Sequence, residues 1–181
     1  MNGLTMEYPL TLSAIARRAD ALFGHKQIVS RRPDKSIHRQ SYADTMERAR
    51  RLAVALRELG VEPGDRVATL GWNHYQHLEA YFAIPTIGAV LHTLNLRLHP
   101  DDLAYIANDA GDRVLLADES LMPLVEQFRP RSGIRRVIVM ARNGGDVTGA
   151  LDYEEMIAAA DPARYEAADG NELSAAALCY T

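Results

Sequence analysis

The chain has 181 residues, the length of about one domain, and its apolar fraction of 48% is enough to form a core. A net charge of −4, with 24% charged residues, gives no electrostatic basis for binding nucleic acid or an anionic membrane. The single cysteine, Cys179, excludes an intrachain disulfide. We find no secretory signal and no apolar run of about 18 residues, so we expect a cytoplasmic protein without a transmembrane segment.

We interpret residues 1–8 as a loose leader and residues 9–181 as one α/β unit. Apolar residues at helical spacing predict a first helix that stops at Gly24; they are Leu12, Ile15, Ala16, Ala19, Leu22 and Phe23. Two strands follow, at 27–31 and 37–41, and the turn residues between them predict a small hairpin.

A second helix is predicted after Ser41, which forms a capping-box pattern with Asp44. Its apolar stripe continues to Gly60, which ends it; the stripe comprises Met46, Ala49, Leu52, Ala53, Leu56 and Leu59. The Pro63-Gly64 pair that follows predicts a type II turn, because its third position needs a positive φ.

The rest of the chain alternates short apolar runs with helical segments. The runs lie at 66–71, 89–94, 113–117, 136–140 and 175–180, and such runs separated by helices predict parallel strands covered on both faces. The first helix between them is predicted to start at Asn73, to end near Pro85 and to turn Leu78, Tyr81 and Phe82 inward. Further helices are expected at 100–110 and 121–128, and a last one after the cap Asp152. The predicted fold class is therefore α/β: a layered, mostly parallel, doubly wound sheet flanked by helices, with an N-terminal helix and a small hairpin.

One long segment also carries a family resemblance. Its characteristic pieces are Gly64-Asp65-Arg66-Val67-Ala68, Gly71-Trp72-Asn73-His74, His77-Leu78-Glu79-Ala80-Tyr81-Phe82-Ala83, Gly88-Ala89-Val90-Leu91-His92-Thr93, Asn95, Arg97-Leu98 and Ala104-Tyr105-Ile106. Together they resemble the N-terminal part of the AMP-forming acyl-CoA synthetases, within the adenylate-forming enzymes. The resemblance is closest to bacterial long- and medium-chain fatty-acid–CoA ligases, and it implies an incomplete domain of a longer enzyme.

The resemblance also implies substrates and roles. Such an enzyme uses a fatty acid, ATP with Mg²⁺, and coenzyme A, and some members of the family form homodimers through the N-terminal region. Thr181 matches the threonine that opens the family's phosphate loop, where its hydroxyl helps to hold the ATP phosphates and Mg²⁺. The alternative for Thr181 is a terminal residue on a frayed strand.

Asn95 and Arg97 lie in a family-like segment, which implies a wall near the acyl or pantetheine channel. The alternative is structural: an asparagine that closes a turn, and an arginine that pairs with Asp101 or Asp102. Most groups that perform the chemistry in the family come after residue 181, so we expect no catalytic residue here and no turnover by this chain alone.

Other candidates lie at the carboxyl ends of the predicted strands, where open α/β sheets bind ligands. His74 and His77 are three residues apart, but no HExxH motif accompanies them, so packing is favoured over zinc binding. His92 is expected to be a core histidine with a satisfied hydrogen bond. Trp72 is expected to pack on the following helix, and Asp118 ends a strand without a GxGxxG motif before it.

Three other functions stay open. A fatty acyl-AMP ligase would stop at the adenylate, and the features that separate it from a CoA ligase lie downstream. A non-catalytic module would use the N-terminal helix and hairpin as a dimer contact. A free-standing flavodoxin-like domain would bind AMP or ATP measurably.

Overall fold

The computed structural model describes residues 8–145, 149–168 and 170–180. Within them the helices are α1 (Leu12–Phe23), α2 (Tyr42–Glu58), α3 (Tyr75–Thr86), α4 (Pro100–Ala110), α5 (Met122–Phe128) and α6 (Tyr153–Ala159). The strands are β1 (Gln27–Arg31), β2 (Ile37–Ser41), β3 (Arg66–Leu70), β4 (Val90–Thr93), β5 (Val114–Asp118), β6 (Arg136–Met140), β7 (Leu151–Asp152) and β8 (Ala177–Leu178).

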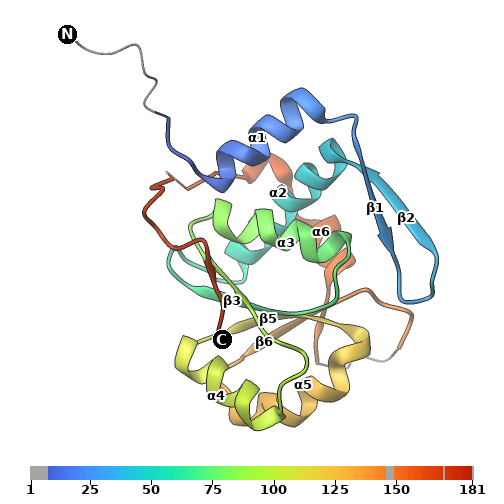
Figure 1. The fold of residues 1–181 in the computed structure, drawn as a ribbon, viewed down its shortest axis with the longest axis vertical. Coiled ribbons are helices and arrows are strands. Elements are labelled where there is room, and N and C mark those ends of the chain that lie inside the picture. The colour runs from blue at the N-terminus through green and yellow to red at the C-terminus, as the bar shows by residue number, and fades with distance from the viewer. Residues whose placement is uncertain (1–7, 146–148, 169, 181) are drawn as a thin grey trace.

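The main sheet has six strands in the order β7-β6-β5-β3-β4-β8, and all of its pairs are parallel. Helices α1, α2, α3 and α6 lie on one side of it, and α4 and α5 lie on the other (Figure 1). Strands β1 and β2 form a separate antiparallel hairpin at the edge of the first layer (Figure 1). The predicted layered α/β fold is confirmed.

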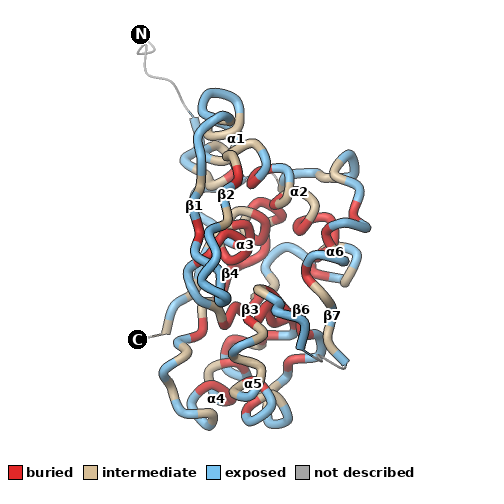
Figure 2. Tube along the Cα trace, turned by 90° about the vertical axis from the view of Figure 1, so that its right-hand side faces the viewer, coloured by how far each residue is buried: buried red, intermediate tan, exposed pale blue. Residues whose placement is uncertain are grey.

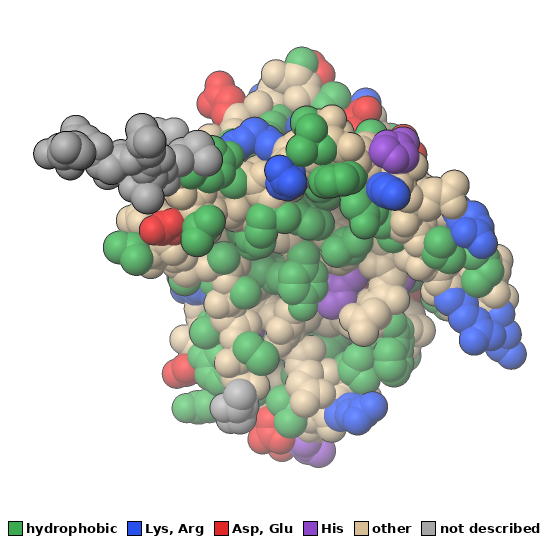
Figure 3. Space-filling model, turned by 45° about the horizontal axis from the view of Figure 1, so that its top comes forward, with side chains coloured by type: hydrophobic (Ala, Val, Ile, Leu, Met, Phe, Trp, Pro, Cys, Tyr) green, Lys and Arg blue, Asp and Glu red, His purple; other side chains and the backbone are tan. Residues whose placement is uncertain are grey.

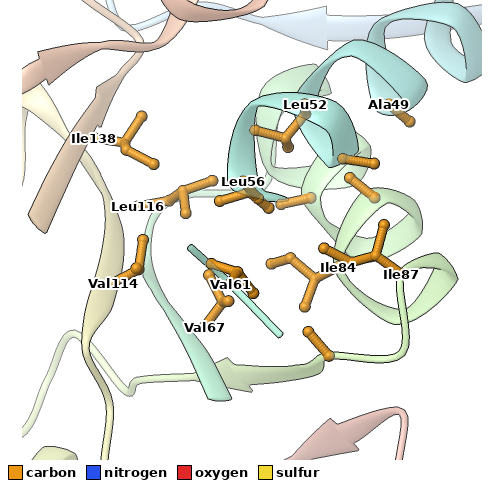
Figure 4. Close-up of a cluster of buried hydrophobic side chains, with 14 of the residues drawn as sticks. Ala49, Leu52, Leu56, Val61, Val67, Ile84, Ile87, Val114, Leu116 and Ile138 are labelled. Carbon is orange, nitrogen blue, oxygen red and sulfur yellow. The ribbon is translucent and has the colours of Figure 1, made fainter. Parts of the chain in front are cut away.

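Two apolar clusters hold the layers together, one on each face of the sheet. In the first, Leu52 and Leu56 of α2 and Ile84 of α3 meet Val67 and Leu116 of the central strands, and all five are 0% exposed (Figure 4). Burial is concentrated along the sheet and α3, whereas the hairpin is mostly exposed (Figure 2). Because both faces of the sheet are covered, the strands show continuous apolar runs in place of an alternating pattern.

Several local signals form as predicted. The backbone N–H of Asp44 donates to the Ser41 hydroxyl at 3.0 Å, and the N–H of Ser41 donates to the Asp44 carboxylate at 2.9 Å, which completes the capping box of α2. Gly64 has φ +87°, and the N–H of Asp65 donates to the carbonyl of Glu62 at 3.0 Å, as the predicted type II turn requires.

The structure corrects four predictions about the helices and strands. Helix α3 begins after His74, not Asn73, and Tyr81, which was predicted to face inward, is 42% exposed. Helix α1 turns Ile15 and Leu22, both 56% exposed, away from the core. The closing strand spans only Ala177–Leu178, and the short strand β7 was not predicted. Strand and helix ends depend on tertiary contacts, so the sequence pattern locates them poorly.

Helix α2 is the longest helix among the described residues. No helix in this part of the chain is long and apolar enough to cross a membrane. Of the predicted leader, residues 1–7 lie outside the described residues, and Tyr8 is exposed.

Candidate functional site

The order of the strands defines where a ligand would bind. The chain runs from β3 to β4 on one side and then crosses to β5 on the other side of β3, so the direction of winding reverses between β3 and β5. Open α/β sheets bind ligands at the carboxyl edge near such a reversal. At this edge β3 leads into Gly71 and Trp72, and β5 ends at Asp118.

Asp118, Trp72 and His74 form a hydrogen-bonded cluster between the carboxyl ends of β3 and β5. Asp118 is 0% exposed and accepts the backbone N–H of Trp72 at 2.8 Å, and its other carboxylate oxygen lies 2.7 Å from Nε2 of His74. A Cβ added to Gly71 would lie 3.1 Å from Met140 Cε and 3.2 Å from the Asp118 carboxylate, so a larger residue would have to displace these side chains by a few tenths of an ångström. The Asp118 carboxylate therefore holds the β3–α3 turn in place.

An open cleft of about 400 Å³ lies next to this group, over the carboxyl ends of the strands. Its walls come from the hairpin, α2, the first turn of α3, the segment after β6 and the start of α6, and they include Arg32, His38, Arg48, His74, Gln76 and Glu154. This volume lies in the range typical of small-molecule sites.

The buried carboxylate of Glu79 connects the elements that form the cleft. Glu79 of α3 is 0% exposed and accepts three hydrogen bonds, from Gln40 at 2.9 Å, from Nε of Arg48 at 2.7 Å and from the hydroxyl of Tyr153 at 2.6 Å. These donors belong to β2, α2 and α6, so one side chain joins four elements. Burial raises the pKa of Tyr153, and the nearby Glu79 carboxylate raises it further, so Tyr153 acts as a neutral donor.

Arg48 extends this network to the cleft surface. Its two terminal nitrogens bind the Glu154 carboxylate at 2.9 and 2.7 Å, which is a bidentate pair. Partial burial opposes the charge of Arg48, but its hydrogen bonds with Glu154 and Glu79 outweigh that cost and raise its pKa. Glu154 also accepts from Gln76 at 2.7 Å, and Gln76 in turn accepts the N–H of Ala141 at 2.7 Å. Through these contacts α3 fixes the segment after β6.

The residues singled out from the sequence lie elsewhere along the edge. Asn95 and Arg97 are exposed after β4, and the Asn95 side chain accepts the backbone N–H of Arg97 at 3.0 Å, as the turn-closing alternative proposes. Arg97 was alternatively predicted to pair with Asp101 or Asp102. Among the described residues it pairs with neither, and Asp101 pairs with Arg131. Strand β8 pairs with β4, so the end of the described chain lies beside β4, the strand that precedes Asn95 and Arg97. Thr181 lies outside the described residues.

The histidines are packed, as expected. His77 is bound between the Trp72 carbonyl and the Thr69 hydroxyl, both at 3.1 Å. Within the described ranges no group of three or more metal-ligating side chains could hold a metal ion. His92 is fully buried and satisfies one ring nitrogen, with Nδ1 2.8 Å from Asp112. Trp72 is 50% exposed, and its predicted packing on α3 stays a prediction.

Glu79, Arg48 and Glu154 were not predicted as a group from the sequence. A signal was present in α3, because Gln76, Glu79 and Ala83 are spaced three and four residues apart and so share a face with the apolar residues Ala80 and Ile84. A carboxylate on the buried face of a helix requires a buried donor. The identity of that donor cannot be derived from the sequence, because Arg48 and Tyr153 are distant along the chain.

The burial of His77 predicts a pH dependence of stability. Burial lowers the pKa of His77 below its usual 6.5, and the hydrogen bond to the Trp72 carbonyl only partly opposes this effect. The unfolded chain therefore binds a proton more readily than the folded chain, so His77 stabilises the fold above about pH 6.5 and this contribution is lost as pH falls below it. We expect the free energy of unfolding of the wild type, measured by urea titration between pH 8 and 5, to fall more steeply than that of His77→Gln.

The exposed His25 provides the control for this prediction, since it lies in the turn before β1 and away from His77. His25→Gln should keep the slope of the wild type. Equal slopes for the wild type and His77→Gln would contradict the assigned role of His77.

Comparison with known proteins identifies the family. The AMP-binding enzyme family matches residues 16–181. A long-chain-fatty-acid–CoA ligase from Thermus thermophilus is 48% identical over 178 residues, which is 97% of this chain and 32% of the relative. A medium-chain-fatty-acid–CoA ligase from Ectopseudomonas oleovorans is 32% identical over 188 residues, which is 100% of this chain and 34% of the relative. The chain belongs to the AMP-binding enzyme family, and it spans about a third of the length of these relatives.

Solved structures agree on the fold. A long-chain-fatty-acid–CoA ligase from Archaeoglobus fulgidus superposes with a TM-score of 0.82 at 22% identity, covering 100% of this chain and 36% of the other. An anthranilate–CoA ligase in complex with anthranoyl-AMP superposes with a TM-score of 0.84 at 22% identity, covering 100% of this chain and 33% of the other. At these identities the likeness establishes the shared fold alone.

Proposed function

We propose that this chain is the N-terminal part of an ATP-dependent fatty-acid–CoA ligase. The observation that carries the proposal is the 48% identity to the Thermus thermophilus long-chain ligase over 97% of the chain. The match to a medium-chain ligase over the whole chain supports the same substrate class. In the proposed reaction the fatty-acid carboxylate attacks the α-phosphorus of ATP, which releases pyrophosphate, and the thiol of coenzyme A then displaces AMP.

The first step joins an anion to a polyanion, so the site must supply positive charge and hydrogen-bond donors. By resemblance, the hydroxyl of Thr181 contributes to holding the ATP phosphates and Mg²⁺, a cation that prefers oxygen ligands. Asn95 and Arg97 form part of the wall of the acyl or pantetheine channel. Their position after β4, on the side of the sheet where β8 pairs, supports this assignment.

A chimera tests the proposal directly. This chain replaces the matching third of the Thermus thermophilus ligase, and AMP release is measured with ATP, coenzyme A and fatty acids of increasing chain length. We expect fatty-acid-dependent AMP release and formation of the acyl-CoA thioester. A folded chimera that binds ATP but activates no fatty acid would refute the proposal, and one that stops at acyl-AMP would favour the acyl-AMP ligase alternative.

Arg97 gives a prediction within the same chimera. If its guanidinium lines the channel that coenzyme A enters, Arg97→Ala should raise the KM for coenzyme A about tenfold, since a charge-assisted hydrogen bond is worth about 1.5–3 kcal/mol. Arg113→Ala is the matched control, because Arg113 is also exposed but precedes β5 at the opposite edge of the sheet. An equal effect of the two substitutions on KM would remove Arg97 from the channel.

We propose further that the 181-residue chain alone does not catalyse adenylation. In the resembled family most of the phosphate-binding groups follow the position of Thr181. An exchange assay between ATP and labelled pyrophosphate should therefore show no activity with this chain and fatty acid. Clear exchange would overturn this part of the proposal.

The outer face of α1 supports a homodimer contact. Ile15 and Leu22 lie on it with 56% of each residue exposed, and Val29 and Ile37 of the neighbouring hairpin are 53% and 56% exposed. Figure 3 shows hydrophobic side chains between Lys and Arg side chains across the face that carries α1. An exposed apolar stripe at helical spacing on a helix is typical of a contact surface.

Leu22→Arg should convert a dimer of this chain into a monomer, as measured by light scattering across a concentration series. A charge in the centre of an apolar interface loses its hydration without gaining a partner, so the dimer is destabilised. Tyr105→Arg is the control, because Tyr105 is 68% exposed on α4, which lies on the other side of the sheet from α1 (Figure 1). A wild-type chain that is monomeric at all concentrations would contradict the homodimer.

A further inference from the structure

The first turn of α3 opens onto the cleft described above. Helix α3 has 12 residues, and no side chain caps its N-terminus. The backbone N–H groups of Tyr75 and Gln76 donate to no described residue, and both residues line the cleft. The N-terminus of a helix carries partial positive charge and unpaired donors, so it favours an anion.

A buried histidine lies at the same place. His74 also lines the cleft, and its side chain is only 4% exposed. Its Nε2 lies 2.7 Å from the Asp118 carboxylate, whereas its Nδ1 is buried without a hydrogen-bond partner among the described residues. A buried polar atom without a partner in a folded protein calls for an explanation, and a ligand is one of the established explanations.

Three arginines and three carboxylates line the cleft, and one of the arginines forms no ion pair with a described residue. Asp34, two residues from Arg32, accepts from the backbone N–H and the hydroxyl of Ser36 at 2.9 and 2.6 Å. Arg48 is matched by Glu79 and Glu154, and Arg142 is matched by Asp152 at 2.6 Å. Arg32 forms no ion pair with a described residue.

Arg32 is held in place by uncharged contacts. It donates through one terminal nitrogen to Nδ1 of His38 at 2.8 Å. His38 stacks on the Tyr75 ring at 3.9 Å, so Arg32 is held near the start of α3 with further donors available.

We propose that this cleft binds the phosphate group of a small phosphorylated molecule at the N-terminus of α3. The donors are the N–H groups of Tyr75 and Gln76 and the guanidinium of Arg32, and Nδ1 of His74 is the buried polar atom without a partner beside them. Donors that approach from several directions suit a tetrahedral phosphate, which offers several acceptor oxygens, better than a planar carboxylate. A volume of about 400 Å³ exceeds one phosphate, so the cleft also has room for the molecule that carries it.

The architecture supports this assignment independently of the proposed ligase activity. The β3–α3 turn is the first strand-to-helix connection of the parallel sheet, and phosphate-binding folds place their ligand at that connection. In this chain Asp118 fixes the turn through the N–H of Trp72 and through His74.

Titration of the ¹⁵N-labelled chain with inorganic phosphate and with glycerol 3-phosphate tests the proposal by NMR. We expect saturable downfield shifts of the Tyr75 and Gln76 amide protons, and the tighter of the two probes identifies free or esterified phosphate as the source. Arg32→Gln should weaken binding about tenfold, as the loss of one charge-assisted hydrogen bond predicts. His74→Phe should weaken it as well.

Arg31→Gln is the matched control, because Arg31 is exposed, adjacent in sequence and not part of the cleft wall. It should leave the affinity unchanged. The proposal fails if neither probe shifts the two amides saturably, or if Arg31→Gln and Arg32→Gln weaken binding equally, since that result indicates only general screening of surface charge. The Arg32 comparison stays decisive if His74→Phe does not fold.

Discussion

Replacing Glu79 with alanine is expected to lower the free energy of unfolding by about 3–5 kcal/mol, the usual cost of removing one partner from a buried ionic group. Glu79 is 0% exposed and accepts from Gln40, Arg48 and Tyr153. Without its carboxylate, the amide of Gln40 and the hydroxyl of Tyr153 lose a buried acceptor. Arg48 keeps Glu154 but loses its inner partner. Urea unfolding followed by circular dichroism measures the loss.

Two further variants separate the charge of Glu79 from its packing. Glu79→Gln keeps the shape and an acceptor oxygen, so we expect a smaller loss of about 1–2 kcal/mol. Glu126→Ala removes an exposed carboxylate from α5 and should change the free energy of unfolding by less than about 0.5 kcal/mol. If Glu79→Ala proved no more destabilising than Glu126→Ala, the four elements would not depend on the Glu79 network.

The second large effect concerns His92 and Asp112, which form a 2.8 Å pair with both side chains 0% exposed. Each leaves one polar atom without a partner among the described residues, namely Nε2 of His92 and Oδ1 of Asp112. Burial raises the pKa of the Asp112 carboxyl, and the hydrogen bond with His92 only partly offsets that cost. We therefore expect His92→Leu, which leaves Asp112 buried and alone, to cost about 3–5 kcal/mol.

The paired substitution should behave differently. Asp112→Val leaves the His92 ring without its partner and should cost about 1–3 kcal/mol. In His92→Leu with Asp112→Val no buried polar group is left without its partner, so the double variant should be within about 1 kcal/mol of the wild type. Urea unfolding of all four proteins gives the coupling energy. Strictly additive losses would show that the pair contributes nothing beyond its separate packing.

The alternation of elements was predictable because it depends on local chemistry. Ser41 with Asp44, and the Pro63-Gly64 turn, act on backbone groups within a few residues of themselves, so these signals appear in the sequence and form as predicted. The parallel strands were predictable because burial on both faces produces continuous apolar runs. Such runs predict that the strands exist and that they are parallel. They do not predict the order of the strands in the sheet.

The candidate site was mostly not predictable. The residues favoured from the sequence, Asn95 and Arg97, lie after β4 and are exposed. The cleft is formed instead by groups from the hairpin, α2, α3 and α6, such as Arg32, Arg48 and Glu154. No local spacing relates these residues.

By itself, the sequence of this chain determined its α/β class, the capping box of α2, the type II turn at Gly64 and its membership of the AMP-binding enzyme family. Each of these depends on residues that act over short range or on a pattern repeated along the chain. Only the tertiary structure decided that Glu79 is shared by three donors, that His74 meets Asp118, and that the first turn of α3 faces a cleft. Those contacts join residues 31 to 74 positions apart, and they form only when the layers pack and exclude water from the groups between them.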